Sequence, residues 1–215
     1  MLSWWKTSDV FFEEEQKIIL EQYPSLSYII KEDSIKLIGE LYIPEINDSY
    51  SIEILFPCDY PNSLPTVKEV DEEIVRDIDL HIYPDGTCCL CLPHLEQFYF
   101  PKGSNISVFI EKLVKPFFAN QAYYKITGKW LNGEYSHGLK GIHEFYIELF
   151  KSDDIKIILQ LLYLSIKSAP NYNKKCYCGS NKSIRKCHLP NIVKLKKYAS
   201  QKQIKDDLVE LLNNY

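Results

Sequence analysis

Two groups of cysteines have spacings that could support chemistry in this 215-residue sequence. The first group, Cys88, Cys89 and Cys91, lies in the middle of the chain. The second lies near the C-terminus, where a Cys-x-Cys pair is followed after eight residues by Cys-His: Cys176, Cys178, Cys187 and His188. Three thiolates and one imidazole form a tetrahedral ligand set typical of structural zinc sites. The total of seven cysteines is odd, which argues against a disulfide framework, and we expect the remaining one, Cys58, in the core.

The C-terminal group begins with Cys-Tyr-Cys-Gly-Ser-Asn and continues through a basic stretch to Cys-His. This segment resembles the SEC-C motif, in which Cys-x-Cys-Gly-Ser-Gly precedes a basic stretch and a Cys-His or Cys-Cys pair. Asn181 stands where the motif has its second glycine, and asparagine tolerates a left-handed backbone. The ligand set leaves no open coordination position. We therefore expect a structural Zn²⁺ ion and a small module that depends on it to fold.

A proline-rich connection and a tight turn lead to the first cysteine group. Residues 57–65 include three prolines, which predict a rigid extended segment. In Tyr-Pro-Asp-Gly at 83–86, proline sets φ at the second turn position and glycine accepts a positive φ. The turn leads to an extended strip in which Cys89 and Cys91 share one face and Cys88 takes the other. Three roles are open to these cysteines: a catalytic nucleophile, packing in the core, or a zinc site together with His94. The zinc site is disfavoured because adjacent cysteines on opposite faces of a strand suit one metal ion poorly.

These two segments, in this order, resemble the ubiquitin-conjugating enzyme (UBC) family. Its members carry Phe-Pro-x-x-Tyr-Pro-x-x-Pro-Pro after the third strand, then His-Pro-Asn, a Tyr-Pro-x-Gly turn, and a catalytic cysteine followed by leucine. Residues 56–65 match the first element, with Leu64 in place of one proline, and residues 83–86 and 89–90 match the turn and the cysteine. The tripeptide differs, because Asp-Leu-His at 79–81 places His81 where the family has asparagine.

The resemblance implies that Cys89 is a nucleophile that holds a protein C-terminus as a thioester and passes it to an amine. The oxyanion formed in that transfer needs a hydrogen-bond donor, a role assigned to the family's asparagine. We hypothesise that His81 replaces it, as donor or as organiser of the loop. Neighbouring sequence offers Cys89 no lysine or arginine to lower its pKa. Glu134 and His137, in a glycine-punctuated segment at 130–138, are further candidates, for which we favour a loop role.

The elements that must position these residues follow an α+β order. Asp9–Gln22 has the apolar spacing of an amphipathic helix. Together with the resemblance, the pattern predicts a UBC-like fold with an N-terminal helix, an antiparallel four-stranded meander and C-terminal helices, plus a small zinc-stabilised module. Strand-like runs lie at 26–30, 35–43 and 50–56, and helical patterns at 107–124, 142–151 and 154–167.

Charge divides the chain near residue 170. Residues 1–170 carry 15 basic and 26 acidic side chains, whereas residues 171–215 carry ten and three. With the polar segment 169–173 as a linker, this predicts a UBC-like conjugating domain over 1–170 and a basic SEC-C-like zinc module with a C-terminal helix over 171–215. The chain lacks an uncharged apolar run of membrane-spanning length, and acids occupy the place of a signal peptide. We therefore expect a cytoplasmic protein without a membrane partner.

The resemblance also implies a biological setting. Stand-alone proteins of this kind occur in bacterial antiphage operons, notably of the CBASS type. There the expected activity is that of a thioester-forming, ubiquitin-conjugating-like transferase in antiviral defence. Its expected protein partner is a substrate with a conjugatable C-terminus, a cyclic-oligonucleotide synthase. The sequence leaves open whether an activating enzyme acts upstream.

Two competing hypotheses remain. A catalytically inactive UBC-like adaptor would dock a partner through its zinc module. The cysteine in its motif favours the enzyme, whereas the missing asparagine favours the adaptor. A zinc-dependent nucleic-acid adaptor would show salt-dependent binding, but it is disfavoured because only two of the 25 basic residues are arginine, which argues against base recognition.

Overall fold

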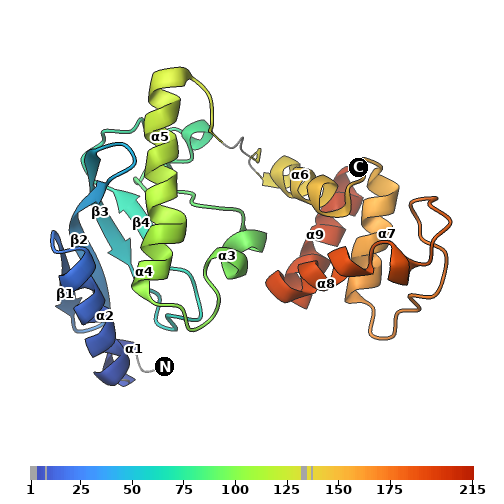
Figure 1. Ribbon diagram of the computed structural model, residues 1–215, viewed down its shortest axis with the longest axis horizontal. Coiled ribbons are helices and arrows are strands. Elements are labelled where there is room, and N and C mark those ends of the chain that lie inside the picture. Colours follow the sequence, from blue (N-terminus) through green and yellow to red (C-terminus); the bar gives the residue numbers. More distant parts are fainter. Residues whose placement is uncertain (1–3, 8, 132–134, 137) are drawn as a thin grey trace. The chain divides into compact units, whose positions relative to one another are not determined.

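The chain forms two compact units, Met1–Gly133 and Glu134–Tyr215 (Figure 1). The structure is a computed structural model that describes residues 4–7, 9–131, 135–136 and 138–215. The unit boundary lies well before the charge change near residue 170, so the division differs from the one expected from composition. None of the described helices combines the length and the apolar character that crossing a bilayer requires.

Unit 1 contains a four-stranded antiparallel sheet in the order β1-β2-β3-β4. Its strands are β1 (Leu26–Lys31), β2 (Ser34–Ile43), β3 (Asp48–Leu55) and β4 (Thr66–Glu69). Along β3 the residues alternate, and Ile52 and Ile54 are buried while their neighbours are partly exposed. This alternation leaves one apolar face on the sheet for helices to cover. The predicted α+β class and the meander are confirmed.

Helices from the N-terminal and the C-terminal parts of the unit 1 sequence pack on that sheet. Near the N-terminus lie α1 (Trp4–Thr7) and α2 (Asp9–Gln22), the predicted amphipathic helix. The predicted helix over 107–124 is a continuous segment made of α4 (Ile106–Phe109), a π-helical turn (Ile110–Val114) and α5 (Lys115–Thr127). Phe118 of this segment stacks on Tyr50 of β3, with ring centroids 4.5 Å apart. The short helix α3 (Pro93–Tyr99) follows the cysteine strip.

A carboxyl group lies buried where α2 meets the start of α4. Glu15 is fully buried and accepts hydrogen bonds from the hydroxyl of Tyr60 at 3.0 Å and from the backbone N–H of Ile106 at 3.1 Å. Burial raises the pKa of Glu15 to about 7. The acidic side of the amphipathic helix therefore contributes one inward-facing acid that accepts a hydrogen bond from the first N–H of α4.

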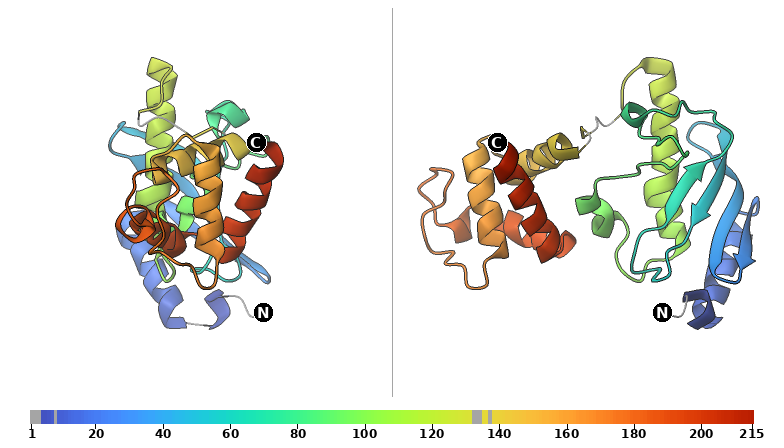
Figure 2. Two further views of the ribbon diagram at one scale, coloured as in Figure 1. Left: turned by 90° about the vertical axis from the view of Figure 1, so that its right-hand side faces the viewer. Right: turned by 180° about the vertical axis from the view of Figure 1, so that it is seen from behind.

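Unit 2 is built from helices around its own core (Figure 2). It contains α6 (Gly138–Phe150), α7 (Ile155–Ile166), a 3-10 turn (Ile184–Lys186), α8 (Leu189–Tyr198) and α9 (Gln201–Asn214). Helix α7 packs against α9 through apolar residues such as Leu161 and Leu208. The hydroxyl of Tyr146 in α6 donates a hydrogen bond of 2.6 Å to buried Asp207 in α9. These contacts join α6 and α7 to the basic C-terminal segment, although the chain changes from acidic to basic near residue 170.

Candidate active site and candidate metal centre

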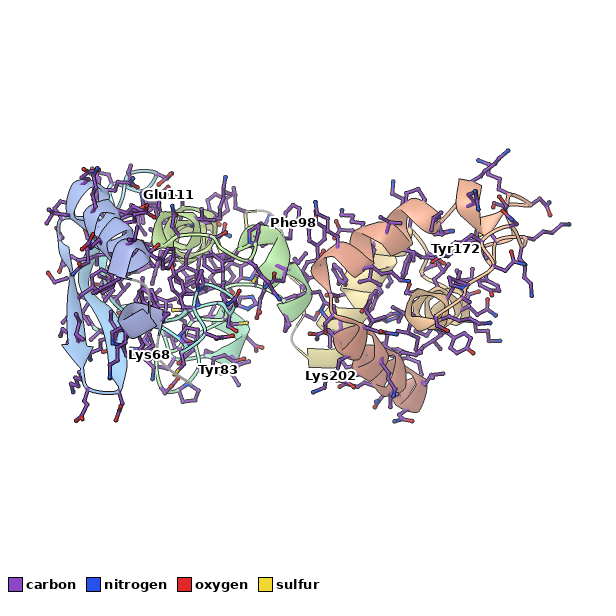
Figure 3. The ribbon with its side chains drawn as sticks, turned by 90° about the horizontal axis from the view of Figure 1, so that it is seen from below. Lys68, Tyr83, Phe98, Glu111, Tyr172 and Lys202 are labelled. Atoms are coloured by element: carbon purple, nitrogen blue, oxygen red, sulfur yellow. The ribbon has the colours of Figure 1, made fainter. Side chains whose placement is uncertain are left out.

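The tight turn before the cysteine strip has the geometry that its residues predict. Gly86 has φ +83°, and its backbone N–H donates to the carbonyl of Tyr83 at 2.9 Å. Asp85 accepts a hydrogen bond from the backbone N–H of Thr87 and pairs with Lys68 at 2.7 Å. Lys68 and Tyr83 are both labelled in Figure 3. The turn is therefore fixed from within and also tied to β4.

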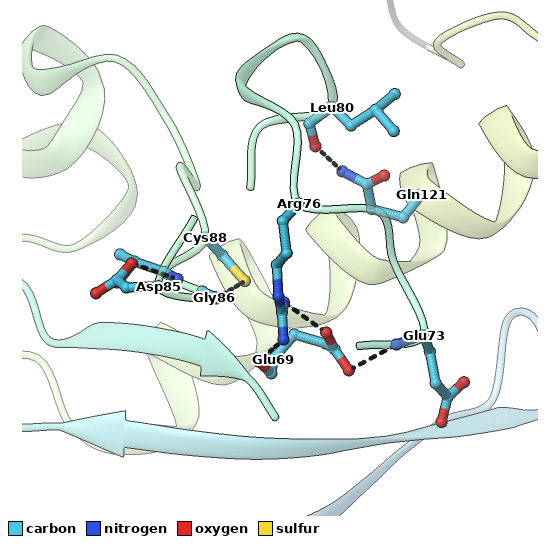
Figure 4. Close-up of polar contacts among 9 residues, drawn as sticks. Glu69, Glu73, Arg76, Leu80, Asp85, Gly86, Cys88 and Gln121 are labelled. Atoms are coloured by element: carbon cyan, nitrogen blue, oxygen red, sulfur yellow. Dashed lines mark hydrogen bonds and ion pairs between the residues drawn. The ribbon is translucent and has the colours of Figure 1, made fainter. Parts of the chain in front are cut away.

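An ion pair packs beside this turn at the edge of the sheet, where the N–H of Glu69 donates to the carbonyl of Gly86 at 3.0 Å (Figure 4). Arg76 donates to the carboxylate of Glu69 at 2.6 Å and to the backbone carbonyl of the same residue at 2.8 Å. A Cβ on Gly86 would lie 2.7 Å from the backbone oxygen of Glu69 and 3.2 Å from the guanidinium carbon of Arg76. Glycine is thus required at position 86 both for its positive φ and for close packing.

The three cysteines of the strip have different environments. The predicted alternation holds for Cys88, which is buried, while Cys89 and Cys91 are half-buried. Burial raises the pKa of both Cys88 and Cys91 to about 12. The fourth cysteine nearby, Cys58, is exposed, so the expectation that it lies in the core is wrong. It occupies the middle of a turn closed by the hydrogen bond from Tyr60 N–H to the carbonyl of Pro57, and this turn directs its side chain to solvent.

Cys89 receives a hydrogen bond from the hydroxyl of Tyr83. Burial and the nearby charge of Glu96 raise the pKa of Cys89, and the Tyr83 hydrogen bond opposes that rise. The negative charge on Cys89 in turn raises the pKa of Tyr83. Among the described residues, the contributions to the pKa of Cys89 come from burial, Tyr83 and Glu96. Its thiol is thus half-exposed, with one polar partner that stabilises the thiolate form.

His81 is joined to Cys89 through the backbone. The carbonyl of His81 accepts a hydrogen bond from the N–H of Cys89 at 2.8 Å. His81 has φ 57° and ψ 26°, a left-handed conformation that ends the 3-10 turn Ile78–Leu80. Its imidazole packs edge-on against Trp130 at 5.3 Å, and Trp130 stacks on Tyr124 of α5 at 4.4 Å. The loop is thus held next to the cysteine strip by aromatic contacts from α5.

A second contact from α5 holds the same loop. Gln121, only 4% exposed, donates from Nε2 to the carbonyl of Leu80 at 2.6 Å, as drawn in Figure 4. Sequence reasoning did not identify Tyr83, Gln121 or Trp130 as site residues. Tyr83 belongs to the Tyr-Pro-Asp-Gly turn, so its place beside Cys89 could have been predicted from the sequence. Gln121 and Trp130 are distant in the sequence and reach the site only through the tertiary fold. Glu134 and His137 lie outside the described residues.

The four C-terminal candidate ligands lie together. Their ligand atoms, three Sγ and one imidazole nitrogen, all lie within 4.8 Å of one another. The Sγ of Cys176 lies 3.0 Å from Nδ1 of His188, and the Sγ atoms of Cys178 and Cys187 are 3.5 Å apart. Tetrahedral zinc with bonds of about 2.0–2.3 Å requires similar ligand–ligand separations. Among the described residues this is the sole such group, so the alternative centre at His94 gains no support.

The backbone and the outer hydrogen bonds suit a metal centre. Gly179 and Asn181 have φ of 73° and 58°, so asparagine adopts the left-handed conformation expected at its position. Nε2 of His188 lies 2.9 Å from the carbonyl of Phe150, which fixes the ring and leaves Nδ1 facing the thiols. A hydrogen bond from Ser180 lowers the pKa of Cys178 to about 6, while burial raises that of Cys176 to about 11.

Comparison with known proteins identifies the family. A family model described as Type II CBASS E2 protein matches residues 15–138, more than half of the chain. The chain belongs to this family. The Type II CBASS E2 match includes His81, Tyr83 and Cys89 and ends before the candidate metal ligands.

Two other comparisons add little to this family assignment. A search among curated proteins found no significant match. A solved structure, the ubiquitin-conjugating enzyme E2 from Plasmodium falciparum, is 22% identical. The alignment covers 48% of this chain and 77% of that one, with a TM-score of 0.33.

Proposed function

We propose that this protein is a ubiquitin-conjugating-like transferase of CBASS antiphage defence, with Cys89 as its thioester nucleophile. The observation that carries the proposal is the contrast within the cysteine strip. Cys88 is buried and Cys91 lies in surroundings that raise its pKa to about 12, whereas Cys89 is half-buried and its hydrogen bond with Tyr83 opposes the rise in its pKa. Family membership supports a conjugating role with protein partners. The conjugated partner in this proposal is the C-terminus of a cyclic-oligonucleotide synthase.

The proposed chemistry has two acyl transfers. First, the Cys89 thiolate attacks the carbonyl carbon of a C-terminus that an activating enzyme has already linked to a leaving group. The S–C bond forms and the leaving group departs with its electron pair. Second, an acceptor amine attacks the thioester carbonyl, loses a proton to solvent or a nearby base, and expels the Cys89 thiolate. Each tetrahedral intermediate carries an oxyanion that a nearby donor would stabilise.

His81 has two possible contributions in this scheme, and a variant series separates them. As a donor to the oxyanion its loss would slow transfer by about 10²–10³-fold. As a loop organiser it would matter because position 81 is left-handed, a conformation for which asparagine and histidine are enriched among non-glycine residues. His81→Asn should keep both roles, and His81→Ala should lose both. His81→Gly keeps the backbone conformation without a donor, so slow transfer in both the glycine and the alanine variants assigns the imidazole a chemical role. Slow transfer in His81→Ala with normal transfer in His81→Gly assigns it to the loop.

The C-terminal ligand set is proposed to hold a structural Zn²⁺ ion. Cys176, Cys178, Cys187 and His188 would supply three thiolates and a neutral imidazole, which fill the tetrahedral positions of zinc. When bound, the ion would cross-link the loop 176–188 and contribute folding free energy. It has no part in the acyl transfers.

The decisive experiment is a search for a reductant-sensitive adduct. The protein is co-expressed with the products of neighbouring genes and run on gels with and without reductant. We expect an adduct in the wild type and in the matched control Cys91→Ala, and none in Cys89→Ala. Cys89→Ser should trap an oxygen ester that resists reductant, and intact mass would identify the attached tail. Absence of any adduct with every partner would instead support the inactive adaptor.

A further inference from the structure

A second surface of the molecule has a distinct charge pattern. Residues 171–205 include ten lysine and arginine residues and no aspartate or glutamate. This stretch is described throughout, and all ten cationic side chains are exposed. It comprises the candidate metal loop, helix α8 and the first turn of α9. Zinc bound by three thiolates would remove only about one positive charge, so the surface stays strongly basic.

None of these cations has a carboxylate within ion-pair distance among the described residues, whereas several cations of unit 1 do. In unit 1, Arg76, Lys68 and Lys115 pair with carboxylates at distances of 2.6–2.7 Å. No ion pair between described residues involves any of the ten cations in 171–205. Their charges are therefore not neutralised by ion pairs within the described residues, and they can contact an anionic partner.

The cations next to the candidate metal centre lie on an ordered backbone. The carbonyl of Lys182 accepts a hydrogen bond from the N–H of Cys176 at 2.8 Å, and that of Lys174 accepts one from Ile184 at 2.9 Å. The N–H of Arg185 donates to the carbonyl of Tyr172 at 2.8 Å. The loop that brings the ligands together thus also fixes the positions from which these side chains project.

The composition of the surface identifies the class of partner. Protein interfaces have an apolar core and are depleted in lysine. Here the large apolar side chains that are well exposed within 171–205 are limited to Tyr177 and Val193. Lysine instead serves as a point charge for phosphate, and contacts to the phosphate backbone need neither arginine nor base recognition. We propose that residues 171–205 bind the phosphodiester backbone of nucleic acid without base specificity.

This proposal is independent of the acyl-transfer chemistry and concerns the other unit of the chain. The scarcity of arginine disfavours sequence recognition, as noted from composition, but not contacts to the backbone. Such contacts are recognised by their salt dependence, because each neutralised phosphate releases counterions. If about four of the ten cations contact phosphates, affinity should fall about 100-fold between 50 and 200 mM salt.

The test measures binding of the full-length, zinc-loaded protein to fluorescein-labelled duplex DNA and single-stranded RNA by fluorescence anisotropy. We expect binding to both at low salt, little difference between sequences, and the salt dependence given above. The triple variant Lys182→Gln, Arg185→Gln, Lys186→Gln should weaken binding at least about tenfold and flatten the salt slope. A matched control removes three exposed cations of unit 1, with glutamine at Lys31, Lys102 and Lys125. It should change affinity by less than about twofold.

Several results would overturn the proposal. One is no binding of either nucleic acid at 50 mM salt, and another is an equal loss in the control variant. Tighter binding to poly-glutamate of matched charge would assign the surface to an acidic protein instead. Tighter binding to vesicles rich in anionic lipid would assign it to a membrane surface. Metal content and circular dichroism of the variants verify that the loop stays folded.

Discussion

Removal of a single hydroxyl, in Tyr83→Phe, should slow the reaction of the Cys89 thiol at neutral pH. The Tyr83 hydrogen bond stabilises the thiolate, so its loss raises the pKa of Cys89. Hydrogen bonds to charged groups contribute about 1.5–3 kcal/mol, and Tyr83 is 43% exposed, so solvent screening reduces this to about 1.4 kcal/mol. That corresponds to about one pKa unit and a tenfold lower thiolate fraction. Because a more basic thiolate is about threefold more nucleophilic, the net rate falls about threefold.

The assay follows alkylation of Cys89 by iodoacetamide between pH 6 and 10, with site-specific mass spectrometry to separate it from the other cysteines. The rate profile of Tyr83→Phe should shift upward by about one pH unit relative to the wild type. Tyr42→Phe is the matched control, because its hydroxyl also donates a hydrogen bond, to Asn47, outside the site. An unchanged profile in Tyr83→Phe, or a faster reaction at pH 7, would refute the assigned role of the hydroxyl.

Four further predictions concern stability. Glu15 has a folded pKa of about 7, above its unfolded value of 4.5, so its contribution is fully present below pH 4.5. That contribution, about 3 kcal/mol of unfolding free energy, should be lost as pH rises to 7 and beyond, and Glu15→Gln should remove this slope. Gly86→Ala should destabilise unit 1 by about 1–3 kcal/mol, because its Cβ would meet the oxygen of Glu69. Gln121→Leu should cost about 1–3 kcal/mol, because it leaves the carbonyl of Leu80 unpaired. Chelation or His188→Ala should unfold the loop 176–188.

Urea unfolding tests the first three predictions. All three tryptophans, Trp4, Trp5 and Trp130, belong to unit 1, so their fluorescence reports on that unit. An equal pH dependence in wild type and Glu15→Gln would contradict the buried-acid argument, and an unchanged midpoint in Gly86→Ala would contradict the close approach at the turn. For the metal centre, circular dichroism before and after chelation is the measurement. No spectral change in a protein shown to contain zinc would contradict a role in folding.

Local signals in the sequence predicted most of the elements and the turn. The alternation of Ile52 and Ile54 identified β3, and proline and glycine around Asp85 identified the turn with its positive φ. The left-handed backbone of Asn181 was likewise expected from its place beside the candidate ligands. Each of these features depends on residues close together in the chain, where periodicity and φ preferences act directly.

Features that depend on contacts between distant segments were not predicted. Gln121 meets Leu80 across 41 residues, and Glu15 meets Ile106 across 91. Polarity and periodicity alone cannot show that these side chains face inward, because each lies in a helix with polar neighbours. The boundary between the two units differs from the division by charge for a related reason. Charge changes near residue 170, but the apolar faces of α7 and α9 pack together across that point.

The left-handed backbone at position 81 bears on whether histidine, in place of the family's asparagine, indicates an inactive protein. The hydrogen bond that ends the 3-10 turn and the contact of Gln121 with Leu80 accompany this conformation at residue 81. Few residue types other than glycine adopt it readily, and they are chiefly asparagine, aspartate and histidine. Of these three, asparagine and neutral histidine can donate a hydrogen bond to an oxyanion, whereas an ionised aspartate cannot. In the proposed assignment, replacement of asparagine by His81 is compatible with both constraints, so this difference alone does not indicate an inactive protein.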